Sequence, residues 1–407
     1  MTLVRNDTTG AVLPMITYSV PCMKAINYAV AANASDPNLT EWTKVGTLAT
    51  RPEVVTNSSR AMMVDPVPSW RGADGTWRMI AACNTLRACM WKAPTAIGPF
   101  TFVGGFGNTE TNKTNSFECP DFWRVPQTDT YVLSTMGEGW AVGNYVPSAN
   151  DSLSDVFVPL HGKNVGSQLD QLFDYGTPGS SAQRTFFDAK HDRQVLWGSA
   201  GGYCRGSDWQ GVMSFPRVVE LDREDSSRLI SFPLPEIADL WTSNVSSGSF
   251  ELVAGATHTL PASFGGNQLD VTFSFDANSS GTFGVRVLAP PGTEATRGVN
   301  VTVSTTPGSV FATLGGGAVS PPSVNRPASR TDFRISGSTI DLRVLVDRAM
   351  VEIFAEGGRT VATAWLCAPD PTTAVGVEVF NLGLETLIVS NVVAHTVASV
   401  SRLPPSL

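Results

Sequence analysis

The residues best suited to chemistry lie in one short stretch, where two carboxylates stand three positions apart among aromatic side chains. Glu118 and Asp121 flank a proline and are followed by Phe122 and Trp123. If a strand begins at Asp121, Glu118 lies at its mouth beside apolar rings, which disfavour the charged carboxylate and raise its pKa. A raised carboxyl pKa suits a general acid that works near neutral pH. The alternative is that Asp121 caps a turn and Glu118 forms a surface ion pair.

The strands that must position these carboxylates follow a repeat in which an acidic turn precedes an apolar strand. Four such turns are spaced 55 to 67 residues apart, at residues 7–10, 74–75, 129–130 and 192–193. This spacing suits a four-stranded propeller blade. Ahead of the last three turns lie further acids at Asp65, Glu118 and Asp174. Because the innermost strands of a propeller line its central channel, we expect these acids to converge there. The alternative is that they are ordinary acidic turns of an all-β protein.

Composition supports an all-β chain that acts on a neutral ligand. The chain has 407 residues, of which 42% are hydrophobic and only 16% charged, with 37 glycines and 27 prolines. Such a mixture favours many short strands joined by turns. The formal net charge of −8 argues against a nucleic-acid or anionic-membrane partner. The sequence contains no unbroken apolar stretch long enough to span a membrane.

The second half of the chain shows a different pattern, with apolar and polar residues in strict alternation. Val271, Phe273 and Phe275 face one way, and the same alternation recurs at 342–346. Half-buried antiparallel strands of this kind are typical of a β-sandwich. We therefore predict a propeller domain at 1–224, truncated at its N-terminus, a linker at 225–247 that contains a helical turn, and a β-sandwich at 248–407.

Several motifs together make the chain resemble glycoside hydrolase family 32, the invertases and fructan-active enzymes. Glu118-Cys119-Pro120-Asp121 matches the family's acid/base signature E-C-P-D. Residues 33–42 resemble its N-L-S-D-P-L-L-x-x-W segment, 173–176 its F-D-Y-G, 210–217 its G-x-x-x-x-P-R, and 345–359 its V-D-x-S-x-V-E-x-F…G-G-R. These motifs cover nearly the whole chain in the family's order.

The resemblance implies a five-bladed β-propeller, here with its N-terminal blade incomplete or missing, followed by a C-terminal β-sandwich. It also implies retaining hydrolysis of β-fructosyl bonds in sucrose or fructans, which needs two carboxyls about 5–5.5 Å apart. By the same resemblance Glu118 is the acid/base and Asp65 stabilises the transition state. The resemblance further suggests substrate contacts for three residues, namely Asp174, Asp121 and Arg184.

The chain departs from the family pattern at the nucleophile. The family's nucleophile is the Asp of an N-D-P-N-G motif on the first blade, and we expect that blade to be absent. Asn6-Asp7-Thr8-Thr9-Gly10 imitates the motif, but by its order in the chain it is a hairpin turn. We therefore do not expect Asp7 to be the nucleophile, which stays unassigned. Val64 replaces the family's Arg beside Asp65, and Arg184 stands for a family Lys.

Three interpretations follow, in decreasing order of preference. The first is a β-fructofuranosidase whose N-terminal part is missing from this chain. The second is a catalytically dead pseudoenzyme that binds sugar or a partner, which Val64 favours. The third is another five-bladed propeller hydrolase that acts on arabinose-containing chains, which E-C-P-D and the sandwich motifs disfavour. No cofactor or metal is expected, since the four histidines are dispersed. The sequence does not indicate an oligomeric state.

Asparagine sequons point to a secretory history. Nine asparagines stand in N-x-[ST] sequons, whereas about four are expected by chance at this Ser/Thr content. We therefore expect a secreted protein of the cell wall or vacuole, although residues 1–7 show no signal-peptide core. The six cysteines allow up to three disulfides, but their scatter shows no compact framework.

Overall fold

The structure is a computed structural model in which strands account for most of the described residues. It describes residues 2–5, 12–19, 24–51, 61–84, 87–106, 118–136, 139–160, 171–176, 179–203, 210–290, 298–319, 329–366 and 375–399. By its contacts the chain divides into two compact units, Met1–Leu172 with Ala182–Arg184, and Phe173–Ser181 with Thr185–Leu407. In these ranges no helix has the length and apolar character needed to cross a membrane.

The first unit contains three antiparallel sheets that follow one another along the chain. The first sheet comprises β1 (Thr2–Arg5), β2 (Val12–Ser19), β3 (Ala25–Ala31) and β4 (Trp42–Thr50). The second comprises β5 (Ala61–Val64), β6 (Trp70–Arg71), β7 (Trp77–Asn84), β8 (Arg87–Ala93) and β9 (Thr101–Gly105). The third comprises β10 (Asp121–Arg124), β11 (Tyr131–Thr135), β12 (Gly139–Val146) and β13 (Val156–Pro159).

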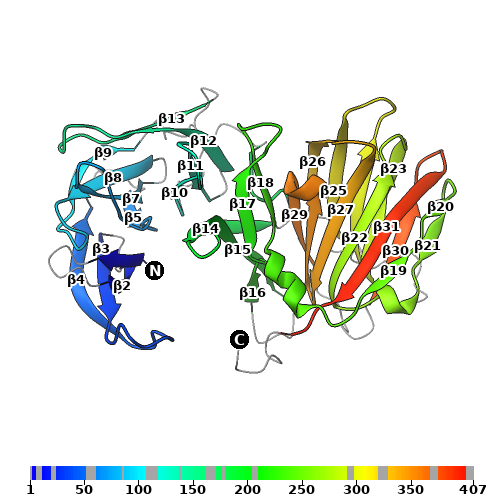
Figure 1. The fold of residues 1–407 in the computed structure, drawn as a ribbon, viewed down its shortest axis with the longest axis horizontal. Coiled ribbons are helices and arrows are strands. Elements are labelled where there is room, and N and C mark those ends of the chain that lie inside the picture. The colour runs from blue at the N-terminus through cyan, green and yellow to red at the C-terminus, as the bar shows by residue number, and fades with distance from the viewer. Residues whose placement is uncertain are drawn as a thin grey trace. The chain divides into compact units, whose positions relative to one another are not determined.

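The second sheet lies between the first and the third, so both of its faces are buried (Figure 1). Met79 of β7 packs with Ile26 and Leu48 of the first sheet. The next residue, Ile80, packs with Phe122 and Leu133 of the third sheet. A strand covered on both faces needs an apolar side chain at nearly every position, which explains the near-continuous apolar run of β7. A disulfide between Cys83 and Cys89 joins β7 to β8.

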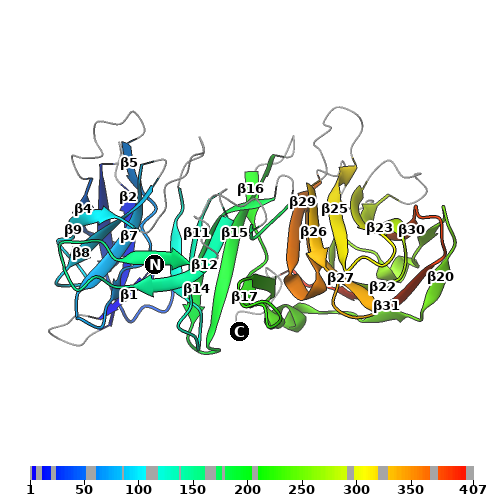
Figure 2. The ribbon, with the colours of Figure 1, turned by 90° about the horizontal axis from the view of Figure 1, so that it is seen from above.

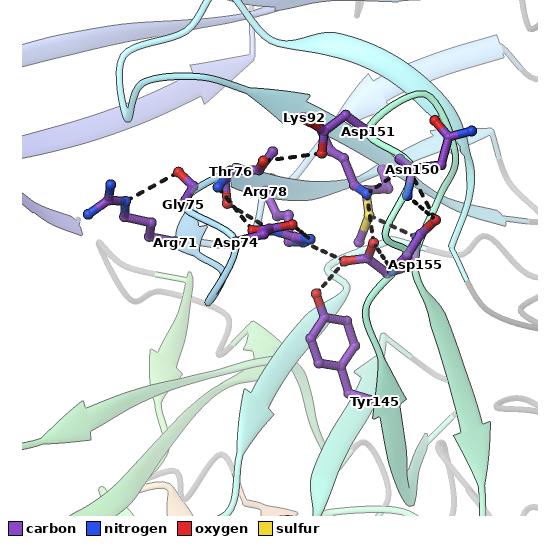
Figure 3. Close-up of polar contacts among 12 residues, drawn as sticks. Arg71, Asp74, Gly75, Thr76, Arg78, Lys92, Tyr145, Asn150, Asp151 and Asp155 are labelled. Atoms are coloured by element: carbon purple, nitrogen blue, oxygen red, sulfur yellow. Dashed lines mark hydrogen bonds and ion pairs between the residues drawn. The ribbon is translucent and has the colours of Figure 1, made fainter.

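Buried charges also connect the second sheet to the third (Figure 3). The Asp155 carboxylate, just before β13, accepts a hydrogen bond from Arg78 Nε at 2.5 Å and lies 2.8 Å from Lys92 Nζ. The Tyr145 hydroxyl donates a hydrogen bond to the same carboxylate. Asp74 accepts hydrogen bonds from both terminal nitrogens of Arg78, each at 2.8 Å. Arg78, Lys92 and Asp155 thus balance their charges where water is excluded, and the exposed Asp74 adds a second carboxylate to Arg78.

The second unit begins with a fourth sheet of the same type. It comprises β14 (Ser180–Asp188), β15 (Arg193–Tyr203), β16 (Gln210–Met213), β17 (Arg217–Leu221) and β18 (Leu229–Pro233). A short 3-10 helix, η2 (Pro235–Leu240), follows β18 and is the helical turn expected there.

The rest of the second unit is a two-layered sandwich, whose layers can be followed in Figure 2. One layer has seven strands, which are β19 (Val245–Ser247), β20 (Phe250–Leu252), β22 (Gln268–Asp276), β27 (Thr339–Asp347), β28 (Met350–Ala355), β29 (Thr360–Trp365) and β31 (Leu387–Thr396). The other has six, which are β21 (Thr257–Thr259), β23 (Gly281–Ala289), β24 (Gly298–Thr305), β25 (Phe311–Val319), β26 (Ser329–Arg334) and β30 (Gly376–Asn381). Two further 3-10 helices are η3 (Ala262–Phe264) and η4 (Glu356–Gly358).

The alternation in sequence explains the sandwich core. Val271, Phe273 and Phe275 of β22 point inward and meet residues such as Phe283 and Val285 of β23. Strand β28 differs, since every one of its side chains is buried. Its second face is covered as well, because Phe354 packs with Ile237 of η2 and Phe215 of the loop before β17 in a separate apolar cluster.

The predicted fold class, an all-β chain with a propeller of the five-bladed type followed by a β-sandwich, is confirmed, and four of the propeller's sheets are described. The strands that follow the four acidic turns are β2, β7, β11 and β15, and each is second in the spatial order of its sheet. The domain boundaries stay a prediction. Within the linker predicted at 225–247, the structure has β18, η2 and β19.

We predict that Asp155→Asn lowers the free energy of unfolding by about 3 kcal/mol, because Arg78 and Lys92 lose a buried counter-charge. Burial works to raise the pKa of Asp155, but hydrogen bonds from Lys92, Tyr145, Ser148 and Arg78 outweigh it and hold this pKa below the usual 3.8. The loss should therefore be present at neutral pH and shrink as the pH falls below about 3.8.

Urea unfolding at several pH values measures this effect. Asp151→Asn is the matched control, because Asp151 lies four residues earlier, is exposed and only accepts a bond from Thr76 Oγ1 at 3.1 Å. Asp151→Asn should change the free energy of unfolding by no more than about 0.5 kcal/mol. Equal losses in the two variants would contradict the stabilising role of the buried charges.

Candidate active site

The E-C-P-D stretch leads directly into β10, as expected. Glu118 is half-buried, and its carbonyl accepts a hydrogen bond from Met136 N at 2.9 Å, which fixes the backbone beside the end of β11. Cys119 follows with a φ of 47°, in the left-handed region that non-glycine residues seldom adopt. Asp121 then starts β10. Within the described residues, the Glu118 carboxylate accepts no hydrogen bond.

Asp65 lies against this stretch, although 54 residues separate it from Cys119. It directly follows β5 and also has a left-handed backbone, with a φ of 54°. Its Oδ2 accepts a hydrogen bond from Cys119 N at 3.0 Å, and the Cys119 thiol lies 3.6 Å from the same oxygen. Two unusual backbone conformations therefore bring the Asp65 carboxylate to the residue next to Glu118. Strain of this kind persists only where surrounding contacts hold it, and it is common at functional sites.

Arg184 joins the same two segments through their backbones. Its Nη2 donates to the Asp65 carbonyl at 2.9 Å, and its Nη1 donates to the Pro120 carbonyl. The planar guanidinium fork suits this double contact. The structure thus gathers Asp65, Glu118 and Arg184, three of the five residues to which a role was predicted. Substrate binding by Arg184 stays a prediction, since the observed partners are backbone oxygens.

The Cys119 thiol reports the electrostatics of this site. Burial raises the pKa of the thiol to about 12, and the negative charges of Asp65 and Glu118 act in the same direction. The positive charge of Arg184 opposes this rise. The sulfur is therefore protonated at neutral pH and is a donor toward the Asp65 carboxylate. No local sequence pattern predicts this contact, because 54 residues separate positions 65 and 119.

Asp121 and Asp174 have much more buried surroundings. Asp121 is 3% exposed and accepts a bond from Phe122 N at 3.1 Å. Asp174, in the second unit, is 7% exposed. Its two carboxylate oxygens accept bonds from Gly176 N, Ser180 Oγ, Arg217 Nη2, Thr363 N and Thr363 Oγ1. Five protein donors fill the acceptor positions of a carboxylate, so its predicted sugar contact stays a prediction.

Arg217 is the centre of a buried cluster that the sequence reasoning missed. It starts β17 and has no exposed side-chain surface. Its guanidinium contacts Asp174 Oδ2 at 3.0 Å and Glu352 Oε2 at 2.7 Å. The other oxygen of Glu352 accepts a bond from Phe215 N at 2.7 Å. A glutamate in the middle of an otherwise apolar strand, Met350–Ala355, was the available signal, because a buried carboxylate requires a cation.

Two further positions bear on the catalytic prediction, and the structure describes only one of them. Val64 is buried against Ala82, so no cation from position 64 accompanies Asp65. Asp7, the residue that imitates the family's nucleophile motif, lies outside the described residues. Among the residues that the structure does describe, no three His, Cys, Asp or Glu side chains are grouped so that they could hold a metal ion.

Two family profiles match the chain almost from end to end. "Glycosyl hydrolases family 32 N-terminal domain" matches residues 7–233, and "Glycosyl hydrolases family 32 C terminal" matches residues 236–396. In sequence the chain is 27% identical to the beta-fructofuranosidase insoluble isoenzyme CWINV3 of Arabidopsis thaliana, over 92% of this chain and 72% of that protein. It is 26% identical to the fructan 6-exohydrolase of Beta vulgaris, over 90% of this chain and 69% of that protein.

A solved structure has the same fold. The crystal structure of fructan 1-exohydrolase IIa from Cichorium intybus superposes with a TM-score of 0.82 and 23% identity. The superposition covers 95% of this chain and 82% of that one. At this level of identity the match establishes the fold alone.

We predict that Cys119 reacts with iodoacetamide at pH 8 on the order of 10³-fold more slowly than an ordinary thiol, because only the thiolate reacts. Asp65→Asn should speed this reaction, since it removes a negative charge that raises the thiol pKa. Mass mapping of the Cys119 peptide measures both rates. Asp129→Asn, a change in the exposed turn before β11, is the control and should leave the rate unchanged. An Asp65→Asn rate no higher than the control's would contradict the predicted coupling.

We predict that Arg217→Met lowers the free energy of unfolding by about 3–5 kcal/mol, because it leaves Asp174 and Glu352 buried without a cation. Glu352→Gln should cost less than about 2 kcal/mol, since the Arg217–Asp174 pair remains and the new side chain still accepts the Phe215 N–H. Urea unfolding of the two variants tests this order. A larger loss for Glu352→Gln would contradict it.

The free energy of unfolding should also depend on pH through Glu352. Burial raises the pKa of Glu352 above its usual 4.5, although Arg217 opposes the rise. The folded protein therefore retains a proton that the unfolded chain has released, and the unfolding free energy decreases as the pH rises above about 4.5. Glu352→Gln should flatten this decrease.

Proposed function

The chain belongs to glycosyl hydrolase family 32, and from this premise we propose that it acts on β-fructosyl bonds such as those of sucrose and fructans. The observation that carries the proposal is the Asp65 carboxylate held at 3.0 Å by the Cys119 amide, next to the half-buried Glu118. Relatives named as beta-fructofuranosidases and fructan exohydrolases support this substrate class. So does the structure of the Cichorium intybus enzyme that was solved in complex with 1-kestose.

Glu118 is the proposed acid/base. As an acid it protonates the oxygen of the leaving group, and as a base it later activates the water that completes hydrolysis. Asp65 is the proposed transition-state stabiliser, because its carboxylate faces developing positive charge on the fructosyl ring. Arg184 fixes the backbones that carry both residues. Asp121 and Asp174 keep the predicted substrate contacts as part of the proposal.

Retaining hydrolysis also needs a carboxylate nucleophile about 5–5.5 Å from the acid/base. That role stays unassigned, since the order of motifs predicts that Asp7 lies in a hairpin turn and not at the nucleophile position. A second candidate function is therefore binding of fructosides without turnover. Val64 favours it, because an apolar side chain stands where the family has a cation beside Asp65.

We expect the chain to bind fructose and short fructans through Asp65. Release of fructose from sucrose or inulin separates the two candidate functions, because acid catalysis without a nucleophile falls far short of measurable turnover. Calorimetry should show heat of binding that Asp65→Ala removes. Asp129→Asn, which alters an acid that is fully exposed, should leave the heat unchanged.

Turnover assays and titrations then decide between hydrolysis and binding without turnover. Turnover that Glu118→Gln lowers by about 10²–10⁴-fold would establish the hydrolase, and a covalent fructosyl peptide trapped during turnover would then identify the nucleophile. Persistence of that turnover in Asp7→Ala would place the nucleophile elsewhere in the chain. Flat titrations with fructose, short fructans and sucrose, together with no turnover, would end both candidate functions.

We also propose that the protein is secreted to the cell wall or vacuole. The names of several relatives describe insoluble isoenzymes. The Cys83–Cys89 disulfide supports an oxidising compartment, because disulfides persist mainly outside the cytosol.

A further inference from the structure

Six of the nine sequon asparagines lie in the described residues, and five of these six are exposed. The exposed five occupy turns or loops between strands, and none lies inside a strand: Asn33, Asn38, Asn150, Asn244 and Asn278. Exposure at a loop is what an N-linked glycan requires of its acceptor. The sixth, Asn300, carries the same sequence signal in a different structural setting, so it provides an internal comparison.

Local hydrogen bonds orient three of the exposed side chains, and in Asn278 it is Nδ2 that donates, to Asp276 Oδ1 at 3.0 Å. Asn33 Oδ1 accepts a bond from Ser35 N at 3.0 Å, and Asn150 Oδ1 accepts one from Ser152 N at 2.9 Å. In both, the bond uses the side-chain oxygen and not Nδ2, the atom to which a glycan is joined. Figure 3 shows the Asn150 amide projecting away from the buried Lys92 and Asp155. Modification at Asn33 and Asn150 therefore leaves the neighbouring contacts intact.

Asn300 lies inside the sandwich sheet and is engaged by its neighbours. It is the third residue of β24, which pairs with β23 on one side and with β25 on the other. Its Oδ1 accepts a bond from Arg286 Nε at 2.8 Å, and Arg286 in turn is paired with Glu378. Arg286 and Glu378 are both largely buried. A glycan on Asn300 would have to emerge through this row of paired side chains.

We propose that Asn33, Asn38, Asn150, Asn244 and Asn278 carry N-linked glycans when the chain passes through the secretory pathway, and that Asn300 does not. The donor is a lipid-pyrophosphate-linked oligosaccharide of the host cell. Asn Nδ2 forms a bond to C1 of the first sugar, the bond from C1 to the pyrophosphate oxygen breaks, and Nδ2 loses one proton. Nothing is oxidised or reduced. The proposal is independent of catalytic activity at Glu118.

The test uses the full chain, secreted from glycosylating eukaryotic cells behind a cleavable leader. Peptide N-glycosidase in heavy-oxygen water converts each glycosylated Asn into a labelled Asp, and peptide mass spectrometry then gives the occupancy of each site. We expect each of the five exposed sites to be more occupied than Asn300, with Asn300 near zero. Occupancy of Asn300 equal to or above that of any exposed site would overturn the proposal.

Two matched variants remove a sequon without altering its asparagine. Ser280→Ala removes the sequon of Asn278, and Thr302→Val removes that of Asn300 with little change in shape. The secreted Ser280→Ala protein should lose the mass of one glycan, whereas Thr302→Val should lose none. Loss of a glycan in Thr302→Val, or no loss in Ser280→Ala, would count against the assignment.

Discussion

Sheets that are covered on both faces impose one constraint: a charge buried inside such a sheet must find a counter-charge, and at two places that counter-charge comes from the layer packed against the sheet. Arg78 of β7 meets it in Asp155 of the third sheet, and Glu352 of β28 meets it in Arg217 of the fourth. Removing one partner leaves an uncompensated buried charge, which costs more than the pair contributes. The pairs therefore determine which layers are neighbours, beyond what apolar contact alone specifies.

In the candidate active site, backbone geometry brings hydrogen-bond donors to the Asp65 carboxylate. Left-handed conformations at Asp65 and Cys119 place an amide donor and a thiol donor on one carboxylate oxygen. Arg184 then fixes the carbonyls on either side. The guanidinium also brings positive charge to the site, since it opposes the rise in the Cys119 pKa.

The sequence was informative wherever the signal was local. Acidic turns followed by apolar runs predicted β7, β11 and β15, and strict alternation predicted the inward face of β22. Long-range pairing was not readable in this way. Nothing near Asp174 indicates that Arg217 and Thr363 will surround it, and nothing near Asp65 indicates Cys119. The family resemblance gave the motifs and their order, but the motifs alone do not say which acids are structural.

Burial separates the four acids that the sequence singled out into two pairs. Asp121 and Asp174 are largely removed from solvent, and the oxygens of Asp174 are fully engaged by protein donors. Asp65 and Glu118 remain partly exposed, and among the described residues the donors to the Asp65 carboxylate, Cys119 N and Sγ, both contact Oδ2. Asp174, by contrast, anchors the loop that follows Phe173 to Thr363 of the sandwich, and a catalytic role for Asp65 and Glu118 stays a prediction.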